Sequence, residues 1–253
     1  MGIELKNRVV VVTGASAGIG AALTQALAAK GAKVVLAARN VERLGEVAER
    51  SGGTCAIAVG DVTVREDVHQ ILATAFAHFG HVDVWINNAG QGISRSLEEL
   101  TDEDVDAMMQ VNLKSALYGM QAVLPHFKSR GSGVLVNVSS MLSRMPLAPQ
   151  RSAYSAAKAA LNALAEGLRA ELAQSHPGLR VMTVLPGIVA TGFGDHARHG
   201  GEDSRALPGG QTPEEVAAAI VRGLEQGEED CYTRPEGVAP VLGYLERLAA
   251  ARG

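Results

Sequence analysis

Short apolar runs alternate with longer segments of helical periodicity along almost the whole chain. The runs are rich in β-branched residues, as in Val9–Val12, and such continuous runs are typical of strands covered on both faces. Strand–helix alternation predicts an α/β fold with a doubly wound, mostly parallel, seven-stranded sheet and right-handed crossovers. The predicted strands are Arg8–Thr13, Lys33–Ala38, Thr54–Val59, Val82–Asn87, Gly133–Ser139, Leu179–Leu185 and Asp230–Thr233. The predicted helices span residues 18–30, 40–50, 64–79, 102–127, 152–175 and 212–226.

No linker, charge block or repeat divides the chain, so all 253 residues are expected to form a single domain. One segment, residues 192–210, breaks the pattern because it is polar, glycine-rich and without apolar periodicity. It follows the sixth predicted strand and so is expected at the carboxyl edge of the sheet, where open α/β folds bind ligands. We predict a mobile substrate lid here. Phe193 or Leu207 would cover an apolar substrate, or Arg198 or Arg205 would meet an acidic group.

Composition narrows the classes of function. The net charge of -4 argues against a general nucleic-acid binder, which would carry a basic surface. The two cysteines, Cys55 and Cys231, are too few for a disulfide framework, and we expect them to be reduced. No segment resembles a signal peptide or is long and apolar enough to span a membrane. We therefore expect a cytoplasmic protein with neither nucleic-acid nor membrane partners.

A glycine-rich turn follows the first predicted strand, in Thr13-Gly-Ala-Ser-Ala-Gly-Ile-Gly20. Gly14 permits a tight turn, whereas Gly18 and Gly20 allow the backbone to approach a phosphate and the next helix to pack on the sheet. The amino end of that helix supplies backbone N–H groups and a partial positive charge. The turn lacks the Gly-Lys-Ser/Thr ending of a nucleotide triphosphatase loop. It predicts a dinucleotide site, although glycines that serve packing alone would leave the same pattern.

Tyr154 and Lys158 are four residues apart in a predicted helix, so a phenol and an ammonium share one helix face. A free phenol has a pKa of about 10 and is a poor acid or base at neutral pH. A fixed cation nearby favours the phenolate and lowers that pKa. The pair is candidate acid–base machinery, although many helices carry Tyr and Lys at this spacing without a catalytic role.

These motifs together resemble the short-chain dehydrogenase/reductase family over about residues 5–235. The glycine turn matches the family's cofactor motif, and Tyr154 with Lys158 matches its Tyr-x-x-x-Lys active-site motif. Further matches, in the family's order along the chain, are Asn87-Asn88-Ala89-Gly90, Asn112, and Pro186-Gly187 followed by Thr191. The resemblance implies a Rossmann fold and an oxidoreductase that transfers hydride between a nicotinamide cofactor and a carbonyl or alcohol substrate, a small molecule.

The resemblance also assigns roles to four catalytic residues. Tyr154 exchanges a proton with the substrate oxygen, and Ser140 hydrogen-bonds that oxygen as charge develops on it. Lys158 lowers the pKa of Tyr154 and binds the nicotinamide ribose. Asn112 is expected to hold a water that connects Lys158 to solvent.

The serine assignment leaves alternatives open. Ser140 aligns with the family's catalytic serine, but its distance to Tyr154 along the chain is one residue longer than is common in the family. A loop insertion is therefore expected within residues 141–153, and Ser139 and Ser143 remain candidates for the same role.

The end of the second predicted strand bears on the choice of cofactor. NAD-specific enzymes place an acid here for the ribose 2′-hydroxyl, whereas NADP enzymes offer Arg to the 2′-phosphate. The position of the acid is Ala38 in this chain, and Arg39 follows it. We therefore predict NADP(H), the alternative being that Arg39 only solvates the start of a helix. The expected cofactor-binding residues are Gly14, Ser16, Gly18, Ile19, Gly20, Arg39, Asp61, Val62, Asn88, Ala89, Gly90, Tyr154, Lys158, Pro186, Gly187, Ile188 and Thr191.

Other functions fit the same motifs less well. A non-catalytic NADP-binding sensor has no need for Ser, Tyr, Lys and Asn together, and isomerases or dehydratases of this fold usually carry a different glycine spacing. His196, His199 and Asp195 lack a further clear ligand, so no metal is expected. The small-residue helices at 102–127 and 152–175 resemble those of the family's four-helix interface, which predicts a homodimer or homotetramer.

Overall fold

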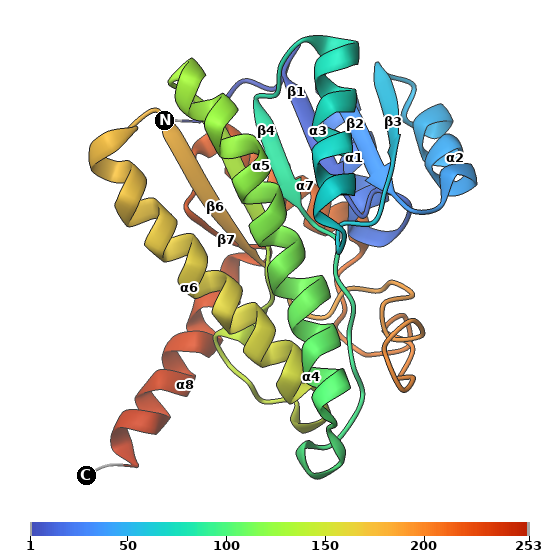
Figure 1. Ribbon diagram of the computed structural model, residues 1–253. Helices are drawn as coiled ribbons and strands as arrows, with labels where there is room; N and C mark the ends of the chain where they lie inside the picture. Colours follow the sequence, from blue (N-terminus) through green and yellow to red (C-terminus); the bar gives the residue numbers. More distant parts are fainter. Residues whose placement is uncertain (1, 252–253) are drawn as a thin grey trace.

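The computed structural model of the protein describes residues 2–251. Seven strands form one parallel sheet in the order β3-β2-β1-β4-β5-β6-β7, which confirms the predicted doubly wound α/β fold (Figure 1). The strands are β1 (Val9–Thr13), β2 (Lys33–Ala38), β3 (Cys55–Val59), β4 (Val84–Asn87), β5 (Gly133–Val138), β6 (Leu179–Leu185) and β7 (Asp230–Tyr232). The α-helices are α1 (Gly18–Ala29), α2 (Val41–Ser51), α3 (Arg65–Phe79), α4 (Asp102–Met109), α5 (Ser115–Arg130), α6 (Ser152–Ser175), α7 (Pro213–Gln226) and α8 (Val238–Ala250).

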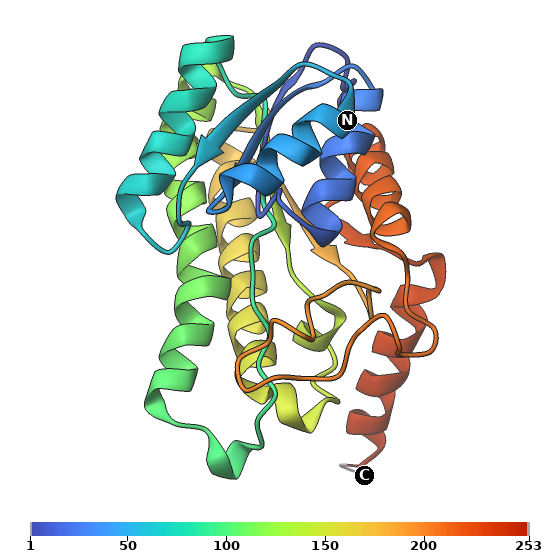
Figure 2. The ribbon, with the colours of Figure 1, turned by 90° about the vertical axis from the view of Figure 1, so that its right-hand side faces the viewer.

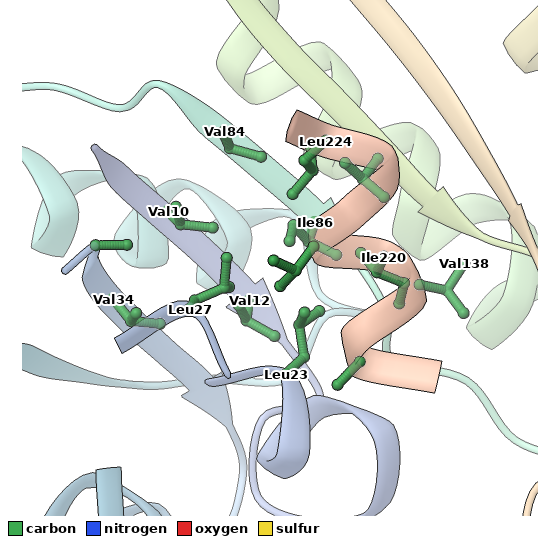
Figure 3. Packing of buried hydrophobic residues seen from close by; sticks show 14 of the residues in the cluster. Val10, Val12, Leu23, Leu27, Val34, Val84, Ile86, Val138, Ile220 and Leu224 are labelled. Atoms are coloured by element: carbon green, nitrogen blue, oxygen red, sulfur yellow. The ribbon is translucent and has the colours of Figure 1, made fainter. Parts of the chain in front are cut away.

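The two faces of the sheet have separate hydrophobic cores, because side chains of a strand alternate between its faces. Val10 and Val12 pack with α1 and α7, whereas Val11 packs with α3 and α5 on the other face. Figure 3 shows the first of these cores, in which Leu23 of α1 and Ile220 of α7 lie over the central strands. Both faces of β1 are thus covered, which explains its continuous apolar run.

Local sequence signals fix the helices that border the loop after β6. Thr212 and Glu215 form a capping box at the start of α7, with Pro213 in its first turn. Gly227 ends this helix in the left-handed conformation, at φ 77°. A second capping box, between Thr101 and Asp104, starts α4. These caps hold the ends of the segments that surround the carboxyl edge of the sheet.

Two parts of the chain differ from the prediction. The helix expected at 102–127 is divided into α4 and α5 by a π-helical turn, Gln110–Lys114. An unpredicted helix, α8, follows β7 and extends away from the body of the molecule (Figures 1 and 2). Within residues 2–251, no helix combines the length and the apolar character that crossing a membrane requires.

Candidate active site

A small hydrogen-bond network locks the glycine turn to the end of β4. The Thr13 hydroxyl donates to the carbonyl of Ile86 (3.1 Å) and accepts from the backbone N–H groups of Asn88 (3.0 Å) and Ala89 (3.2 Å). The Asn88 amide donates in return to the carbonyl oxygens of Thr13 (2.9 Å) and Gly14 (3.3 Å). Thr13 is the centre of this cross-link, and sequence reasoning missed its role although it directly precedes Gly14.

The glycines of the turn sit where a side chain has no room. Gly14 has a φ of 66°, and a Cβ there would lie 2.9 Å from the Cα of Ala89. A Cβ on Gly20 would lie 2.2 Å from the carbonyl oxygen of Gly14. Gly18, at φ 52°, faces the Thr191 side chain, 3.2 Å from where its Cβ would be. The turn is thus packed against β4 on one side and the segment after β6 on the other.

Tyr154, Ser140 and Lys158 come together at the carboxyl end of β5. Tyr154 is in the first turn of α6 and is buried, and the Ser140 hydroxyl is near enough to lower the pKa of its phenol. Lys158 follows one turn later, also buried, and its ammonium donates to the carbonyl of Val138 (2.8 Å). This ammonium lies 3.5 Å from where a Cβ on Gly90 would be, so it faces the loop after β4.

Burial dominates the electrostatics of this cluster. It raises the pKa of the Tyr154 phenol to about 12, against the Ser140 hydroxyl and the positive charge of Arg151, which act in the opposite direction. Burial also lowers the pKa of the Lys158 ammonium to about 8. The net pKa of Tyr154 is therefore above that of a free phenol, while the contribution of Lys158 to it stays a prediction. Desolvation of the phenolate outweighs the nearby cations, and Tyr154 is a neutral phenol at neutral pH.

The hydroxyls of the other two candidate serines, Ser139 and Ser143, form hydrogen bonds with groups other than Tyr154. The Ser139 hydroxyl donates to the backbone carbonyl of Lys158 (3.4 Å). The Ser143 hydroxyl donates to the carbonyl of Ser140 and accepts from the Asn162 amide (2.7 Å). Of the three serines, Ser140 is the one whose hydroxyl lowers the pKa of Tyr154. Two short 3-10 turns, Met141–Ser143 and Pro149–Arg151, lie in the segment where an insertion is expected.

Asn112 occupies the π turn between α4 and α5 and is buried. Its amide pairs with the backbone of Gln91, accepting from the N–H (3.2 Å) and donating to the carbonyl (2.9 Å). π turns are frequent at functional sites because they turn a side chain out of the regular helical pattern. Here the side chain holds the loop after β4, and a Cβ on Gly90 would come within 2.8 Å of its oxygen. Its role in a proton relay stays a prediction.

Arg39 and Asp61 lie together at the ends of β2 and β3. The Arg39 guanidinium is 3.6 Å from the Asp61 carboxylate, and its side chain is 80% exposed. Asp61 accepts from the N–H (2.9 Å) and hydroxyl (2.7 Å) of Thr63, so its carboxylate closes a local turn. These bonds and Arg39 hold the pKa of Asp61 below its usual value, against the opposing effect of burial. The remaining predicted cofactor residues follow strands at the same edge: Ser16, Ile19, Val62, Pro186, Gly187 and Ile188.

The loop of residues 192–210 runs beyond the carboxyl ends of the strands (Figures 1 and 2). Arg198 pairs with the segment after β4: its N–H donates to the Gly92 carbonyl (2.9 Å), and its carbonyl accepts from the N–H of Ser94 (3.0 Å). The ring of Phe193 meets the Tyr154 ring edge to face, with centroids 5.7 Å apart. The loop thus reaches the candidate site, while its mobility stays a prediction.

One carboxylate anchors this loop. Asp104, at the start of α4, has no exposed side-chain surface. Its carboxylate accepts hydrogen bonds from the side chains of Arg198 (2.5 Å), His199 (2.7 Å) and Arg95 (3.0 Å). These hydrogen bonds, that of His199 first, hold the pKa of Asp104 well below its usual range. Sequence reasoning missed this anchor. The capping box of Thr101 and Asp104 is a local pattern that places Asp104 at the start of α4, but it does not indicate the partners in the loop. Within residues 2–251, no three His, Cys, Asp or Glu side chains are grouped in a way that could hold a metal ion.

Comparison with known proteins assigns the chain to a family. The family model described as short chain dehydrogenase matches residues 8–201. An uncharacterized oxidoreductase of Staphylococcus saprophyticus is 36% identical over 228 residues, which is 88% of this chain and 94% of that protein.

Solved structures agree with this assignment. The alcohol dehydrogenase from the archaeon Thermococcus sibiricus, complexed with 5-hydroxy-NADP, has a TM-score of 0.79 and 32% identity, covering 90% of this chain and 96% of its own. A short-chain dehydrogenase/reductase from Burkholderia phymatum, in complex with NAD, has the same fold, with a TM-score of 0.89 at 24% identity over 99% and 97% of the two chains. The chain therefore belongs to the short-chain dehydrogenase/reductase family of oxidoreductases.

Proposed function

We propose that the protein is an NADP(H)-dependent oxidoreductase that reduces a ketone or aldehyde, or in the reverse direction oxidises an alcohol. The observation that carries the proposal is the buried Tyr154, which the Ser140 hydroxyl influences and which the Lys158 ammonium follows one helical turn later. A phenol that keeps its proton at neutral pH is suited to donate it to a carbonyl oxygen as that oxygen becomes an alkoxide.

The carboxyl edge of the sheet fits a dinucleotide. Gly14 and Gly18 have positive φ and leave backbone where a side chain would block close approach, beside the amino end of α1. The first turn of α1 contains no acidic residue that would repel a pyrophosphate. The Lys158 ammonium, one face of which is turned to Gly90, has donors left for the ribose hydroxyls. The bound nicotinamide would supply or accept the hydride.

Each residue of the site then has a defined task. Tyr154 holds the transferred proton at its phenol oxygen, and Ser140 hydrogen-bonds the substrate oxygen where negative charge develops. Lys158 stabilises the phenolate once the proton has left, because an ammonium favours the charged form of a nearby phenol. Asn112 keeps the loop after β4 in position through its two bonds to Gln91.

Arg39 supports the choice of NADP(H). It is exposed at the end of β2, and its one neighbouring carboxylate, Asp61, is 3.6 Å away. A 2′-phosphate would accept charge-assisted hydrogen bonds from this guanidinium, for which a preference for NADPH of about 10- to 100-fold is expected. Arg39→Ala should remove most of that preference, whereas Arg43→Ala, an exposed arginine in α2, should retain it. Equal affinity of the native protein for NADH and NADPH would contradict the assignment.

Turnover with a panel of ketones and aldehydes, followed by loss of NADPH absorbance, tests the reaction. Tyr154→Phe keeps the ring against Phe193 and should bind NADPH as the native protein does, yet reduce turnover to below a few per cent. NADPH binding without turnover in the native protein would favour the non-catalytic sensor. Redox-neutral conversion of a substrate would favour an isomerase or dehydratase. The homodimer or homotetramer expected through α5 and α6 is a separate proposal, which sedimentation at micromolar concentration would test.

A further inference from the structure

Arginine side chains gather around the loop of residues 192–210, and most of their charges are matched within the protein. Arg198 is bound to Asp104, as described above, and Arg205 is bound to Asp195 (2.6 Å) and Asp203 (2.8 Å). The two arginines that the sequence offers for an acidic substrate group therefore already have carboxylate partners. Their positions hold the loop together and do not leave a free cation for a ligand.

Arg151 is different. It is half-buried at the start of α6, three residues before Tyr154. Among residues 2–251, no carboxylate oxygen lies within 4.0 Å of its guanidinium, and its side chain donates no hydrogen bond. Its charge nevertheless acts on Tyr154, because it lowers the pKa of the phenol. An unmatched cation that is partly removed from water is costly, and a ligand anion would offset that cost.

The absence of side chains at two neighbouring positions lets the Arg151 guanidinium lie beside the candidate site. Two glycines face its guanidinium, from the segment after β4 and from the loop after β6. A Cβ on Gly92 would lie 2.7 Å from Nη1, and a Cβ on Gly201 would lie 3.5 Å from Nη2. The guanidinium thus lies where these two segments meet the first turn of α6, the same turn that carries Tyr154. A single planar guanidinium suits a carboxylate, which it binds through two parallel N–H donors.

We propose that Arg151 binds the carboxylate of the substrate, so that the protein acts on oxo acids and the corresponding hydroxy acids. This inference rests on the proposed function and names its substrate class. The carboxylate end of the substrate contacts Arg151, while the carbonyl oxygen reaches Tyr154 and Ser140. Phe193, whose ring edge meets the Tyr154 ring, covers the carbon chain between them. Arg151 is the residue directly before α6, and Tyr154 lies in the first turn of that helix, so the two side chains are near one another along the chain.

The test compares matched acidic and neutral substrates. The probes are 2-, 3- and 4-oxo acids, each beside its methyl ester, with the initial rate of NADPH loss as the readout. The native protein should prefer at least one acid over its ester. Arg151→Met should lower kcat/KM for that acid by about 10- to 100-fold, the scale of a charge-assisted hydrogen bond, and leave kcat/KM for the ester within about threefold. Arg151→Lys keeps the positive charge but lacks the two parallel N–H donors of the guanidinium, so it should recover part of the loss in kcat/KM.

Arg205→Met is the matched control, because it removes an arginine of the same region whose charge is already paired. It should change the rates for acid and ester equally little. An equal loss for both substrates in Arg151→Met, or a native preference for the esters, would overturn the inference. NADPH affinity should be the same in native protein and Arg151→Met, and a large fall would instead make Arg151 a cofactor residue.

A failure of the proposed function is distinguishable from a failure of this inference. If the native protein reduces none of the probes, calorimetry of the same oxo acids on NADP-saturated protein still tests Arg151. Binding that is lost in Arg151→Met and retained in Arg205→Met supports the carboxylate site, and absence of binding to the native protein refutes it.

Discussion

The glycine turn after β1 and the loop of residues 192–210 border the same candidate site, but different forces hold them. The turn is fixed by close backbone contact and by hydrogen bonds around Thr13, without an ion pair. The loop buries few apolar side chains, Ala197 among them, and is held by the cations around Asp104 and by backbone pairing with the segment after β4. Steric fit leaves the turn one conformation, whereas polar contacts on an exposed loop allow it to open at a small cost.

This difference assigns distinct tasks to the two regions. A rigid turn presents backbone donors in a fixed position, as a phosphate requires. A loop that opens and closes admits substrate and then excludes water from the reaction. Mutations should therefore change global stability when they touch the turn, and local opening when they touch the loop.

The largest effect is expected from Gly20→Ala. Its Cβ would lie 2.2 Å from the backbone oxygen of Gly14, a contact that no rotamer change relieves. We expect a loss of unfolding free energy of about 3 kcal/mol or more, measured by urea denaturation. Gly45→Ala in α2 is the control, since its Cβ meets nothing within 4 Å, and it should gain about 0.5–1 kcal/mol. Equal effects of the two substitutions would show that the turn is not sterically fixed.

The buried ammonium of Lys158 shows what a charge costs where side chains are closely packed, in contrast to the exposed charges of the loop. Burial lowers the pKa of Lys158 from 10.5 in a free side chain to about 8. Below pH 8 the ammonium is charged in both the folded and the unfolded protein, so the desolvation cost is fully present. It is relieved as the pH rises from about 8 to 10.5. Lys158→Met should therefore raise the unfolding free energy at pH 7, by up to about 3 kcal/mol, while abolishing turnover.

The gain in Lys158→Met should shrink as the denaturation is repeated at increasing pH up to about 10. As a control, Arg39→Met, which removes an exposed cation at the end of β2, should show no such gain at any pH. A Lys158→Met protein less stable than the native one at pH 7 would mean that the hydrogen bond to Val138 outweighs the burial of the charge.

Asp104→Asn should act on the loop and much less on the whole molecule. Removing the carboxylate charge leaves Arg198 and His199 without their anion, so the segment 192–200 should exchange its amide hydrogens at least about tenfold faster. Asp106→Asn, an exposed aspartate on the same helix, should leave exchange unchanged. Because the pKa of Asp104 is held well below its usual range, native protection of the loop should persist at pH 5 and be lost only at more acidic pH. Unchanged exchange in Asp104→Asn would refute its role as the anchor.

The smallest effect is expected from Arg205→Gln. Its pairs with Asp195 and Asp203 are exposed, and such pairs contribute little because water screens them. The urea midpoint should not move measurably, and exchange in the loop should rise less than in Asp104→Asn. A larger effect than that of Asp104→Asn would locate the anchor of the loop at Arg205.

The sequence predicts what depends on local pattern and misses what depends on distant partners. Strands such as β1 and β6 are identified to within a residue because β-branched runs covered on both faces leave a clear signal. α8 is missed, since Pro240 and Gly243 weaken its helical pattern, although a proline in the first turn needs no intrahelical donor.

The candidate site shows the same limit. The positions of Tyr154 and Lys158 follow from their spacing on one helix face, and the structure brings both to the edge expected from the sheet order. The pairing of Arg198 with Asp104 joins residues 94 apart along the chain, which no local pattern encodes. The direction of the pKa change at Tyr154 likewise depends on how deeply the fold buries the phenol, and motif spacing carries no information on burial.

The π turn between α4 and α5 also shifts the sequence register of the two helices. An α-helix advances about 100° per residue, and a π turn holds one residue more than an α turn, so α4 and α5 are out of register by one position. If the chain lacked one residue within 110–114, a continuous α-helix would carry α4 and α5 in their present orientations, because the π turn accommodates its extra residue within itself. Asp104 would keep its place beside Arg198, whereas the widened turn that presents Asn112 to Gln91 would be lost. One additional residue thus serves the amide at the site and leaves the anchor of the distant loop unaffected.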